Sequence, residues 1–282
     1  MPELPEVETV RRGLQPVMEG AKILHAEARR KDLRFPFQKD FVARLTGQTV
    51  TGLGRRAKYL MADLGSGDVL LMHLGMSGSF RVHKMGDDDT PGRFHHVRAK
   101  DAAHDHVVFH MSSGADIVFN DPRRFGYMKI IARDELDDEP LLKGLGPEPL
   151  GNEFDAAMLA KACAGKKTSL KAALSDQRVV AGLGNIYAAE ALHVAGIWPM
   201  RAAGTLATPA GQPRDEAYRL ATAIKQVLRR AIARQTAKRY RSARFLVYDR
   251  ESERCPRPGC GGTIRRRTQA GRSTFYCANC QR

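Results

Sequence analysis

The segment Cys255-Pro-Arg-Pro-Gly-Cys260-Gly-Gly-Thr-Ile-Arg-Arg-Arg-Thr-Gln-Ala-Gly-Arg-Ser-Thr-Phe-Tyr-Cys277-Ala-Asn-Cys280 decides the fold of the C-terminal part of this chain. Its two cysteine pairs, with four and two residues between the partners, are separated by 16 residues, a spacing typical of zinc ribbons. Four thiolates complete a tetrahedral site and leave no position open for catalysis. We therefore predict one structural zinc ion, held by Cys255, Cys260, Cys277 and Cys280.

The sequence around this segment is strongly basic. The chain of 282 residues has 46 Lys and Arg against 31 Asp and Glu, a formal charge of +15. Residues 241–282 alone contain ten arginines and no lysine against three acidic residues. A positive charge of this size indicates a polyanionic partner such as nucleic acid, and we expect the ribbon to present its arginines to DNA.

The hundred residues before the ribbon have helical spacing, and the segment before them is acidic and rich in Pro and Gly. We predict a linker at residues 133–152, a helical DNA-binding domain at 153–240 and the zinc ribbon at 245–282. The helices are expected at residues 154–164, 167–175, 185–195 and 214–235.

The N-terminal part, residues 1–132, alternates between apolar and polar residues and has turns at close spacing, which favours a β-sandwich or barrel. A short helix over residues 5–14 precedes it, and the acidic triplet at residues 87–89 is interpreted as a loop. The strands are expected at residues 22–28, 49–53, 59–64, 69–74, 80–83, 106–110, 116–119 and 127–131.

The N-terminus does not have the pattern of a secretory signal, because it is acidic and contains two prolines. The most apolar stretch, residues 179–198, is interrupted by Asn185, Glu190 and His193, so no membrane span is expected. Cysteines in metal spacing fit a reducing compartment. We therefore expect a cytoplasmic protein with no membrane contact.

The first three residues, Met1-Pro2-Glu3, suggest covalent chemistry. Removal of Met1 would leave a free secondary amine on Pro2, and α-amino groups titrate low enough to be partly unprotonated nucleophiles at neutral pH. Attack on the C1′ atom of a sugar would give a cationic iminium, which acidifies the C2′ hydrogen and permits β-elimination. Glu3 could then act as a general acid. The alternative is that these residues simply precede a helix.

Three internal segments are suited to DNA. Arg123 and Phe125 in Asp-Pro-Arg-Arg-Phe-Gly, with Met76 at a loop, could fill the space left by an extruded base. The turn Gly-Leu-Gly-Asn185 leads into a helix and could bind phosphate. Lys166 and the lysines after it could also contact phosphates. Each segment has a simpler interpretation as a solvated turn, a helix cap or core packing.

Together these motifs resemble the bacterial formamidopyrimidine-DNA glycosylases, which remove oxidised purines during base-excision repair. The matching motifs, among them Pro-Glu-Leu-Pro-Glu-Val-Glu-Thr, His-Leu-Gly-Met-Ser-Gly, Asn-Asp-Pro-Arg-Arg-Phe-Gly and Gly-Leu-Gly-Asn-Ile-Tyr, extend over nearly the whole chain. The resemblance implies an α+β fold with an N-terminal β-sandwich, a central helix–two-turn–helix domain and a C-terminal zinc ribbon. It also implies a monomer that binds damaged double-stranded DNA and needs no protein partner.

The same resemblance implies roles for individual residues. Pro2 would form the Schiff base, Glu3 would be the general acid, Lys58 would assist β-elimination and Arg272 would bind phosphate and support δ-elimination. The residues implied to contact DNA are Met76, His104, Arg123, Phe125, Lys166, Lys171 and Asn185.

The chain departs from the family pattern in two places. The first cysteine pair encloses four residues where many relatives have two, which should enlarge the knuckle. The segment 234–245 is short and has no glycine where relatives carry a loop over the flipped base, so ring-opened purines or abasic sites could be better substrates than 8-oxoguanine. Three alternatives remain open: an endonuclease VIII-like enzyme for oxidised pyrimidines, a non-catalytic scaffold that binds damaged DNA, and an RNA-binding zinc protein.

Overall fold

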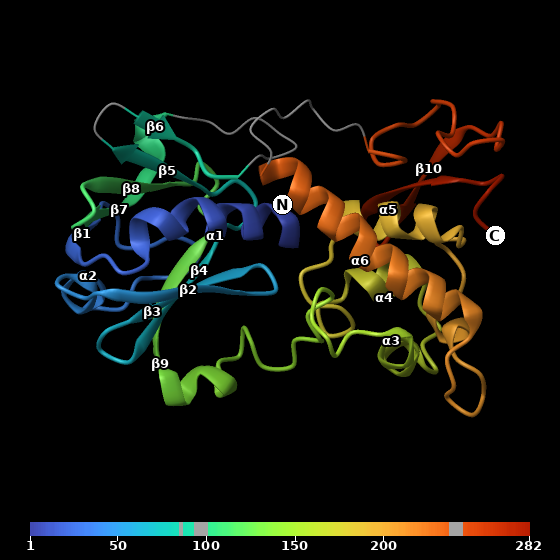
Figure 1. The fold of residues 1–282 in the computed structure, drawn as a ribbon, viewed down its shortest axis with the longest axis horizontal. Helices are drawn as coiled ribbons and strands as arrows, with labels where there is room; N and C mark the ends of the chain where they lie inside the picture. Colours follow the sequence, from blue (N-terminus) through green and yellow to red (C-terminus); the bar gives the residue numbers. More distant parts are fainter. Residues whose placement is uncertain (85–86, 93–100, 237–244) are drawn as a thin grey trace. The chain divides into compact units, whose positions relative to one another are not determined.

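The computed structural model describes residues 1–84, 87–92, 101–236 and 245–282. These residues divide into two compact units, Met1–Lys143 and Gly144–Arg282 (Figure 1). Among the described helices, none is long and apolar enough to cross a membrane.

The first unit contains two antiparallel sheets, as Figure 1 shows. The five-stranded sheet has the order β1-β7-β8-β5-β6, and the four-stranded sheet has the order β2-β3-β4-β9. The five strands of the first sheet are β1 (Ile23–Ala28), β7 (Asp105–Met111), β8 (Ala115–Asn120), β5 (Ser79–Lys84) and β6 (Asp87–Asp89). The four strands of the second are β2 (Val50–Arg56), β3 (Tyr59–Leu64), β4 (Asp68–His73) and β9 (Tyr127–Ala132).

A single apolar core fills the space between these two sheets. It combines Leu60 and Ala62 of β3 with Phe80 of β5 and Phe109 of β7, each fully buried. Alternate residues of β3 point to this core, as the period of two in the sequence predicts. The N-terminal β-sandwich is therefore confirmed.

Helix α1 (Leu4–Met18) is longer than the sequence predicts. The expected end near Gly13 was wrong, because the helix continues through Gly13 and Pro16. A Cβ atom at residue 13 would lie 2.5 Å from the Cβ atom of Pro91. This glycine permits a close approach of another segment and does not end the helix.

Two further elements of this unit were not predicted. The acidic triplet is not a loop, because β6 pairs through its backbone with the edge of β5, with Asp89 opposite Val82. The short helix α2 (Phe41–Leu45) buries Phe41 and Leu45. The turns η1 (Ala102–His104) and η2 (Arg133–Asp138) complete the unit.

The second unit is mainly helical. Its helices are α3 (Ala156–Cys163), α4 (Leu170–Ser175), α5 (Asn185–Ala195), η3 (Ala203–Leu206) and α6 (Asp215–Thr236). Helix α4 starts three residues later than expected, since Ser169 Oγ accepts a hydrogen bond from Ala172 N (3.3 Å) and so caps the helix. Helix α5 ends at Gly196, whose φ of 70° is left-handed.

The C-terminal module packs directly on helix α5. Strands β10 (Ile264–Gln269) and β11 (Arg272–Cys277) form an antiparallel hairpin whose turn places Ala270 and Gly271 at φ 47° and 71°. Ile264 and Phe275 share a small core with Ala189 of α5 and with Val247. The helical and ribbon parts therefore form one body.

Candidate functional site

The N-terminus is held by the first turn of α1. Glu3 occupies the N-cap position and is 3% exposed. Its backbone N–H donates to Glu6 Oε2 (2.9 Å), and its carbonyl accepts from Val7 N (3.1 Å). Pro2 is also buried. Residue 2 is thus placed directly before a capped helix, with a buried carboxyl group beside it.

Lys58 is tied to the same helix through a short chain of polar contacts. Glu8 of α1 accepts a hydrogen bond from Arg55 Nε (3.2 Å), and Arg55 Nη1 donates to the Ala57 carbonyl (2.8 Å). Ala57 has a left-handed φ of 51° in the turn between β2 and β3. Lys58 follows it and is 5% exposed. These contacts fix the turn that carries Lys58 with respect to α1.

Glu8, which begins this chain of contacts, has a carboxyl group with a lowered pKa. Burial opposes its ionisation, but hydrogen bonds from Arg11 and Arg12, with the charges of Arg11 and Arg55, outweigh burial and lower its pKa to about 2. Its carboxylate accepts from Arg11 Nε (3.1 Å) and Nη2 (3.0 Å) and from Arg12 Nε (2.8 Å). The carboxylate of Glu8 is therefore charged at neutral pH.

His73 connects the surroundings of Lys58 to the Met76 loop. Burial, with the charges of Lys58 and Arg34, lowers the pKa of His73 to about 4, so the imidazole is neutral at pH 7. Its Nδ1 atom accepts the backbone N–H of Gly75 (3.0 Å). A neutral histidine is required here, since a protonated Nδ1 could not accept that bond.

The three residues predicted to fill the gap left by an extruded nucleotide are brought together around Asp121. Ser77 Oγ, next to Met76, donates to Asp121 Oδ1, and Gly126 N donates to Asp121 Oδ2 (2.8 Å). Arg123 N donates to Ser77 Oγ (3.1 Å). Asp121 is fully buried. Its carboxylate joins two loops, since Ser77 and Asp121 lie 44 residues apart in the sequence.

The same two loops also touch through their backbones. A Cβ atom added to Gly75 would lie 2.3 Å from Gly126 N and from Phe125 C. Only glycine allows this approach. On the outer side, Phe125 is 44% exposed, and the Arg123 guanidinium carbon lies 4.7 Å from the centre of its ring. Met76 is half-buried.

His104 belongs to the same cluster. It ends η1, whose N-terminus is capped by Asp101 Oδ1 accepting from Ala103 N (2.9 Å). The His104 carbonyl accepts from Asp121 N (3.0 Å). The structure therefore gathers Met76, His104, Arg123 and Phe125 around one buried aspartate.

In the second unit, Lys171 and Asn185 meet the hairpin beside Arg272. Lys171 Nζ donates to Asn185 Oδ1, and both side chains donate to the carbonyl of Ser273, at 3.4 Å from Lys171 Nζ and 3.0 Å from Asn185 Nδ2. Lys171 is 2% exposed. Arg272, the residue before Ser273, is exposed.

Lys166 stands apart from this group. It is half-buried in the connection between α3 and α4, and its backbone carbonyl accepts from Gly204 N (2.9 Å). Within the described part of the chain, no hydrogen bond joins its side chain to Lys171 or Asn185.

The four predicted zinc ligands converge at the end of the hairpin. One sulfur atom from each of Cys255, Cys260, Cys277 and Cys280 lies within 4.8 Å of the others. Gly262 must lack a side chain here, because a Cβ atom would lie 2.8 Å from Cys277 Sγ. A closed set of four thiolates fits a structural zinc ion and offers no open position.

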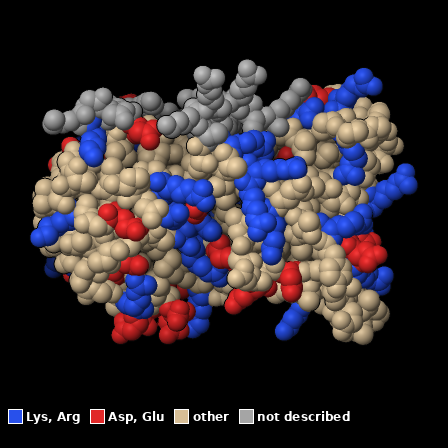
Figure 2. All heavy atoms as spheres, viewed as in Figure 1, with Lys and Arg blue, Asp and Glu red and all other residues tan. Residues whose placement is uncertain are grey.

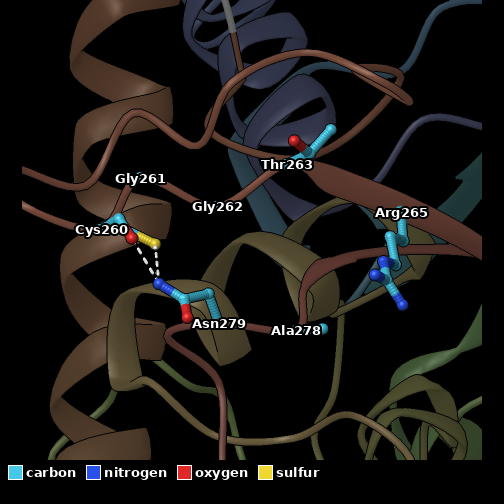
Figure 3. A pocket seen from close by; sticks show the side chains of 7 residues that line it. All are labelled: Cys260, Gly261, Gly262, Thr263, Arg265, Ala278 and Asn279. Atoms are coloured by element: carbon cyan, nitrogen blue, oxygen red, sulfur yellow. Dashed lines mark hydrogen bonds between the residues drawn. The ribbon is translucent and has the colours of Figure 1, made fainter.

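Asn279 is hydrogen-bonded to Cys260, as the dashed lines in Figure 3 show. Its Nδ2 atom donates to the Cys260 carbonyl and to Cys260 Sγ (3.4 Å). This hydrogen bond is the main reason that the pKa of Cys260 falls to about 6. The hydrogen bond from Asn279 thus favours the thiolate form of Cys260, which is the form that binds a metal. The fifth cysteine, Cys163, is buried in α3, as expected, and burial raises its pKa to about 11.

Two carboxylates that organise the site were missed in the sequence. Glu190 of α5, which was noted only as an interruption of an apolar stretch, accepts the backbone N–H groups of Leu246 (2.8 Å), Val247 (2.8 Å) and Tyr248 (3.0 Å). Asp121 was treated only as part of a turn. A buried acidic residue inside an apolar helical run is a signal that could have identified Glu190.

The described surface of the second unit is rich in positive charge. Blue side chains gather over α6 in Figure 2, and the exposed basic residues of this helix include Arg219, Arg229, Arg230 and Arg234. Such a surface attracts the phosphate backbone of DNA. The segment 234–245, for which the sequence predicts an altered loop, lies mostly outside the described residues, which stop at 236 and resume at 245.

Comparison with known families gives three matches along the chain. Residues 1–128 match the formamidopyrimidine-DNA glycosylase N-terminal domain. Residues 145–241 match the H2TH domain of the same enzymes. Residues 252–282 match a zinc finger found in FPG and IleRS.

Individual proteins agree with these matches. The chain is 71% identical to a formamidopyrimidine-DNA glycosylase from Bradyrhizobium diazoefficiens and 68% identical to one from Rhodopseudomonas palustris, over 100% of both chains in each case. Among solved structures, it is similar to an FPG mutant of Lactococcus lactis in complex with DNA containing Fapy-dG. The TM-score is 0.82 at 32% identity, again over 100% of both chains. A complex of Lactococcus lactis Fpg with abasic-site DNA also gives 0.82, at 31% identity and 99% coverage of both chains.

Proposed function

Since the chain belongs to the formamidopyrimidine-DNA glycosylase family and is a zinc-containing DNA-repair glycosylase, we propose that it excises oxidised and ring-opened purines and then cleaves the abasic site. The substrates are formamidopyrimidine and 8-oxoguanine lesions in duplex DNA. The observation that carries this proposal is the buried Pro2-Glu3 pair at the capped start of α1.

The reaction begins with the nitrogen of Pro2, after removal of Met1. Its lone pair attacks C1′ of the damaged nucleotide, and the C1′–N bond to the base breaks. The proline nitrogen then loses its proton and the C1′–O4′ bond of the sugar ring opens, which leaves an iminium. Glu3 supplies the proton that this step needs, to the sugar ring oxygen or to the leaving group. Its burial at the N-cap keeps that carboxyl group within a dry, fixed environment.

The positive charge of the iminium acidifies the C2′ hydrogen. Loss of this proton and departure of the 3′ phosphate constitute β-elimination, and Lys58 assists it from the turn that Glu8 and Arg55 tie to α1. Arg272 binds phosphate and supports the following δ-elimination of the 5′ phosphate. The product is a one-nucleotide gap with phosphates at both ends.

The remaining residues hold the DNA. Met76, Arg123 and Phe125 fill the gap left by the extruded nucleotide, and the two loops that carry them share the Asp121 carboxylate. His104, Lys166, Lys171 and Asn185 contact the backbone. The arrangement of Lys171 and Asn185 on the Ser273 carbonyl supports this role, because it orients both side chains beside Arg272.

Borohydride trapping tests the proposal. The full zinc-loaded chain is incubated with duplexes containing 8-oxoguanine, a formamidopyrimidine, an oxidised pyrimidine or an abasic site, and mass spectrometry locates the linked residue. We expect a crosslink at Pro2 on both purine lesions. A crosslink at any other residue would overturn the assignment of the nucleophile, and no crosslink with any duplex would identify a non-catalytic scaffold.

Two variants separate the steps. A chain with one uncleaved residue ahead of Pro2 should lose trapping on all four duplexes while it still binds them. Glu3→Gln should lose excision of the purines but retain some trapping on the preformed abasic site. Equal loss on all substrates would contradict the role of Glu3 in base removal.

A preference for oxidised pyrimidines is the second candidate function, and one observation is the reason for including a pyrimidine lesion among the four duplexes. A wild-type Lactococcus lactis FPG with a TM-score of 0.82 to this chain has been solved with DNA containing an oxidised pyrimidine. Stronger trapping on the pyrimidine than on either purine would replace the proposed substrate class.

We also propose that the protein acts on chromosomal DNA in the cytoplasm as a monomer. The mass of one chain is 31.2 kDa. Light scattering of the free protein and of its DNA complex should give one chain in each, and a second chain in either would contradict the monomer.

A further inference from the structure

The knuckle between Cys255 and Cys260 is docked on the C-terminal end of helix α5. Arg257, in the middle of the knuckle, donates through Nη2 to the carbonyls of His193 and Val194 (3.2 Å to Val194). A cation at this end also complements the negative end of the helix dipole. Arg257 is one of the four residues that the first cysteine pair encloses.

The side chain of His193 reaches back to the metal site from the same turn of the helix. Its Nε2 atom lies 3.3 Å from Cys255 Sγ, and the residue is 3% exposed. Its Nδ1 atom is buried and has no hydrogen-bond partner among the described residues. A buried N–H group without a partner costs more than an unpaired ring nitrogen that merely accepts. The hydrogen therefore belongs on Nε2, where it points at the sulfur.

We propose that His193 is a positioning residue of the zinc site, which donates a hydrogen bond from Nε2 to the Cys255 thiolate and secures the knuckle on helix α5. The bond delocalises charge from one of four crowded thiolates. It also restrains the ligand that begins the knuckle, so that Cys255 leaves the metal less easily. This inference rests on the zinc site and is independent of the proposed catalytic steps.

The surroundings of the ring favour this role. Cys280 Sγ lies 3.8 Å from Cys255 Sγ. Its neighbour Gln281 is anchored to the segment that follows α5, with Nε2 donating to the Ile197 carbonyl (3.0 Å). Gln281 Oε1 accepts from Cys277 N (2.8 Å). The residues that hold the cysteines thus converge on residues 193–197, and His193 is the side chain among them that reaches a sulfur atom.

Zinc release and cobalt spectroscopy test the proposal on the full chain. The zinc-loaded protein is mixed with an excess of chelator, and zinc transfer is followed over time. We expect His193→Phe, which fills the same space without a donor, to release zinc about 10-fold faster, as for other lost outer-sphere partners. In the Co²⁺-substituted protein, its thiolate-to-metal charge-transfer band should move to longer wavelength.

Two controls distinguish hydrogen bonding from packing. His193→Gln can still donate an N–H, so it should stay close to the wild type in both measurements. His25→Phe, an exposed histidine of the first unit, should change neither. A purely structural role would lower thermal stability in His193→Phe and leave the cobalt band in place, and that result would overturn the proposal.

A measurement on the wild-type protein covers the case in which His193→Phe does not fold. A ¹H–¹⁵N spectrum of the histidine rings in the zinc-loaded protein should show a slowly exchanging Nε2 proton for His193. Assignment of the hydrogen to Nδ1 would refute the proposed bond.

Discussion

Glu8→Gln should destabilise the first unit, and the loss should depend on pH. Glu8 accepts hydrogen bonds from Arg11, Arg12 and Arg55. A glutamine has the same shape but no charge, and its amide NH₂ would face one of the guanidinium groups. The substitution therefore removes the charge that joins α1 to the turn before Lys58.

The pKa of Glu8 sets the size of the effect. Its fall from 4.5 to about 2 corresponds to about 3 kcal/mol of folding free energy. The carboxylate side chain is 12% exposed, so solvent screening reduces this value, and we expect about 1.5–3 kcal/mol at pH 7. A carboxyl group whose folded-state pKa is lowered stabilises the fold above its unfolded-state pKa. The contribution declines as the pH falls from 4.5 towards 2, and roughly 40% of it remains at pH 3.

Urea unfolding measures this difference. The single tryptophan, Trp198, lies in the second unit, so its fluorescence follows that unit, while circular dichroism follows both. For Glu8→Gln we expect the transition of the first unit to shift by about 1 M urea at pH 7. The difference from the wild type should shrink at pH 3.

Glu135→Gln is the matched control, because it removes one negative charge from an exposed position of the same unit. Its effect should be small at both pH values. If Glu8→Gln and the wild type differ by the same free energy at pH 7 and pH 3, the ion cluster does not stabilise the fold in the way described.

Four other outcomes are expected. Asp121→Asn should weaken binding to lesion DNA about 10-fold, because the amide cannot accept from both Ser77 and Gly126. Fluorescence anisotropy measures this affinity, and an affinity equal to that of the wild type would contradict the prediction. Gly75→Ala should lower stability by more than about 1 kcal/mol owing to its left-handed φ and the backbone contact, so an unaltered melting temperature would refute the close approach. Cys277→Ala should reduce zinc from near one ion per chain to near none, as read by elemental analysis, and retained zinc would exclude the four-cysteine site. DNA affinity should fall steeply with salt concentration through counterion release, and a flat dependence would speak against phosphate contacts.

The strands of the sheets could be predicted from the sequence because the alternation of apolar and polar residues is visible within each short segment. Residues 59–64 alternate so that Leu60, Ala62 and Leu64 face the core, and that period of two is visible without any partner. Strand β6 was missed because an acidic triplet has low strand propensity, and its pairing is made by the backbone with β5. The zinc ligands were predicted because each pair of cysteines is close in sequence, and the metal determines their geometry.

The organisation of the candidate site was less accessible from the sequence. Asp121 joins loops that are distant in the chain, and its neighbours in sequence do not indicate Ser77 as a partner. The bond from His193 to Cys255 spans 62 residues, and only the folded helix places the ring beside the sulfur. Sequence motifs therefore predicted which residues act, while the residues that hold them in place became visible only in three dimensions.

Helix α5 sets the distance between the residues at the hairpin and the residues at the zinc site. Asn185, at its first turn, holds the Ser273 carbonyl, and His193, eight residues later, faces the zinc thiolates. At 1.5 Å per residue these positions are about 12 Å apart along the axis. Because Ala188, Ala191 and Leu192 are fully buried, the helix has little room to tilt. The zinc site and the hairpin are thus held at a fixed spacing by one rigid helix, so a change at the metal would be transmitted to the hairpin and its arginines.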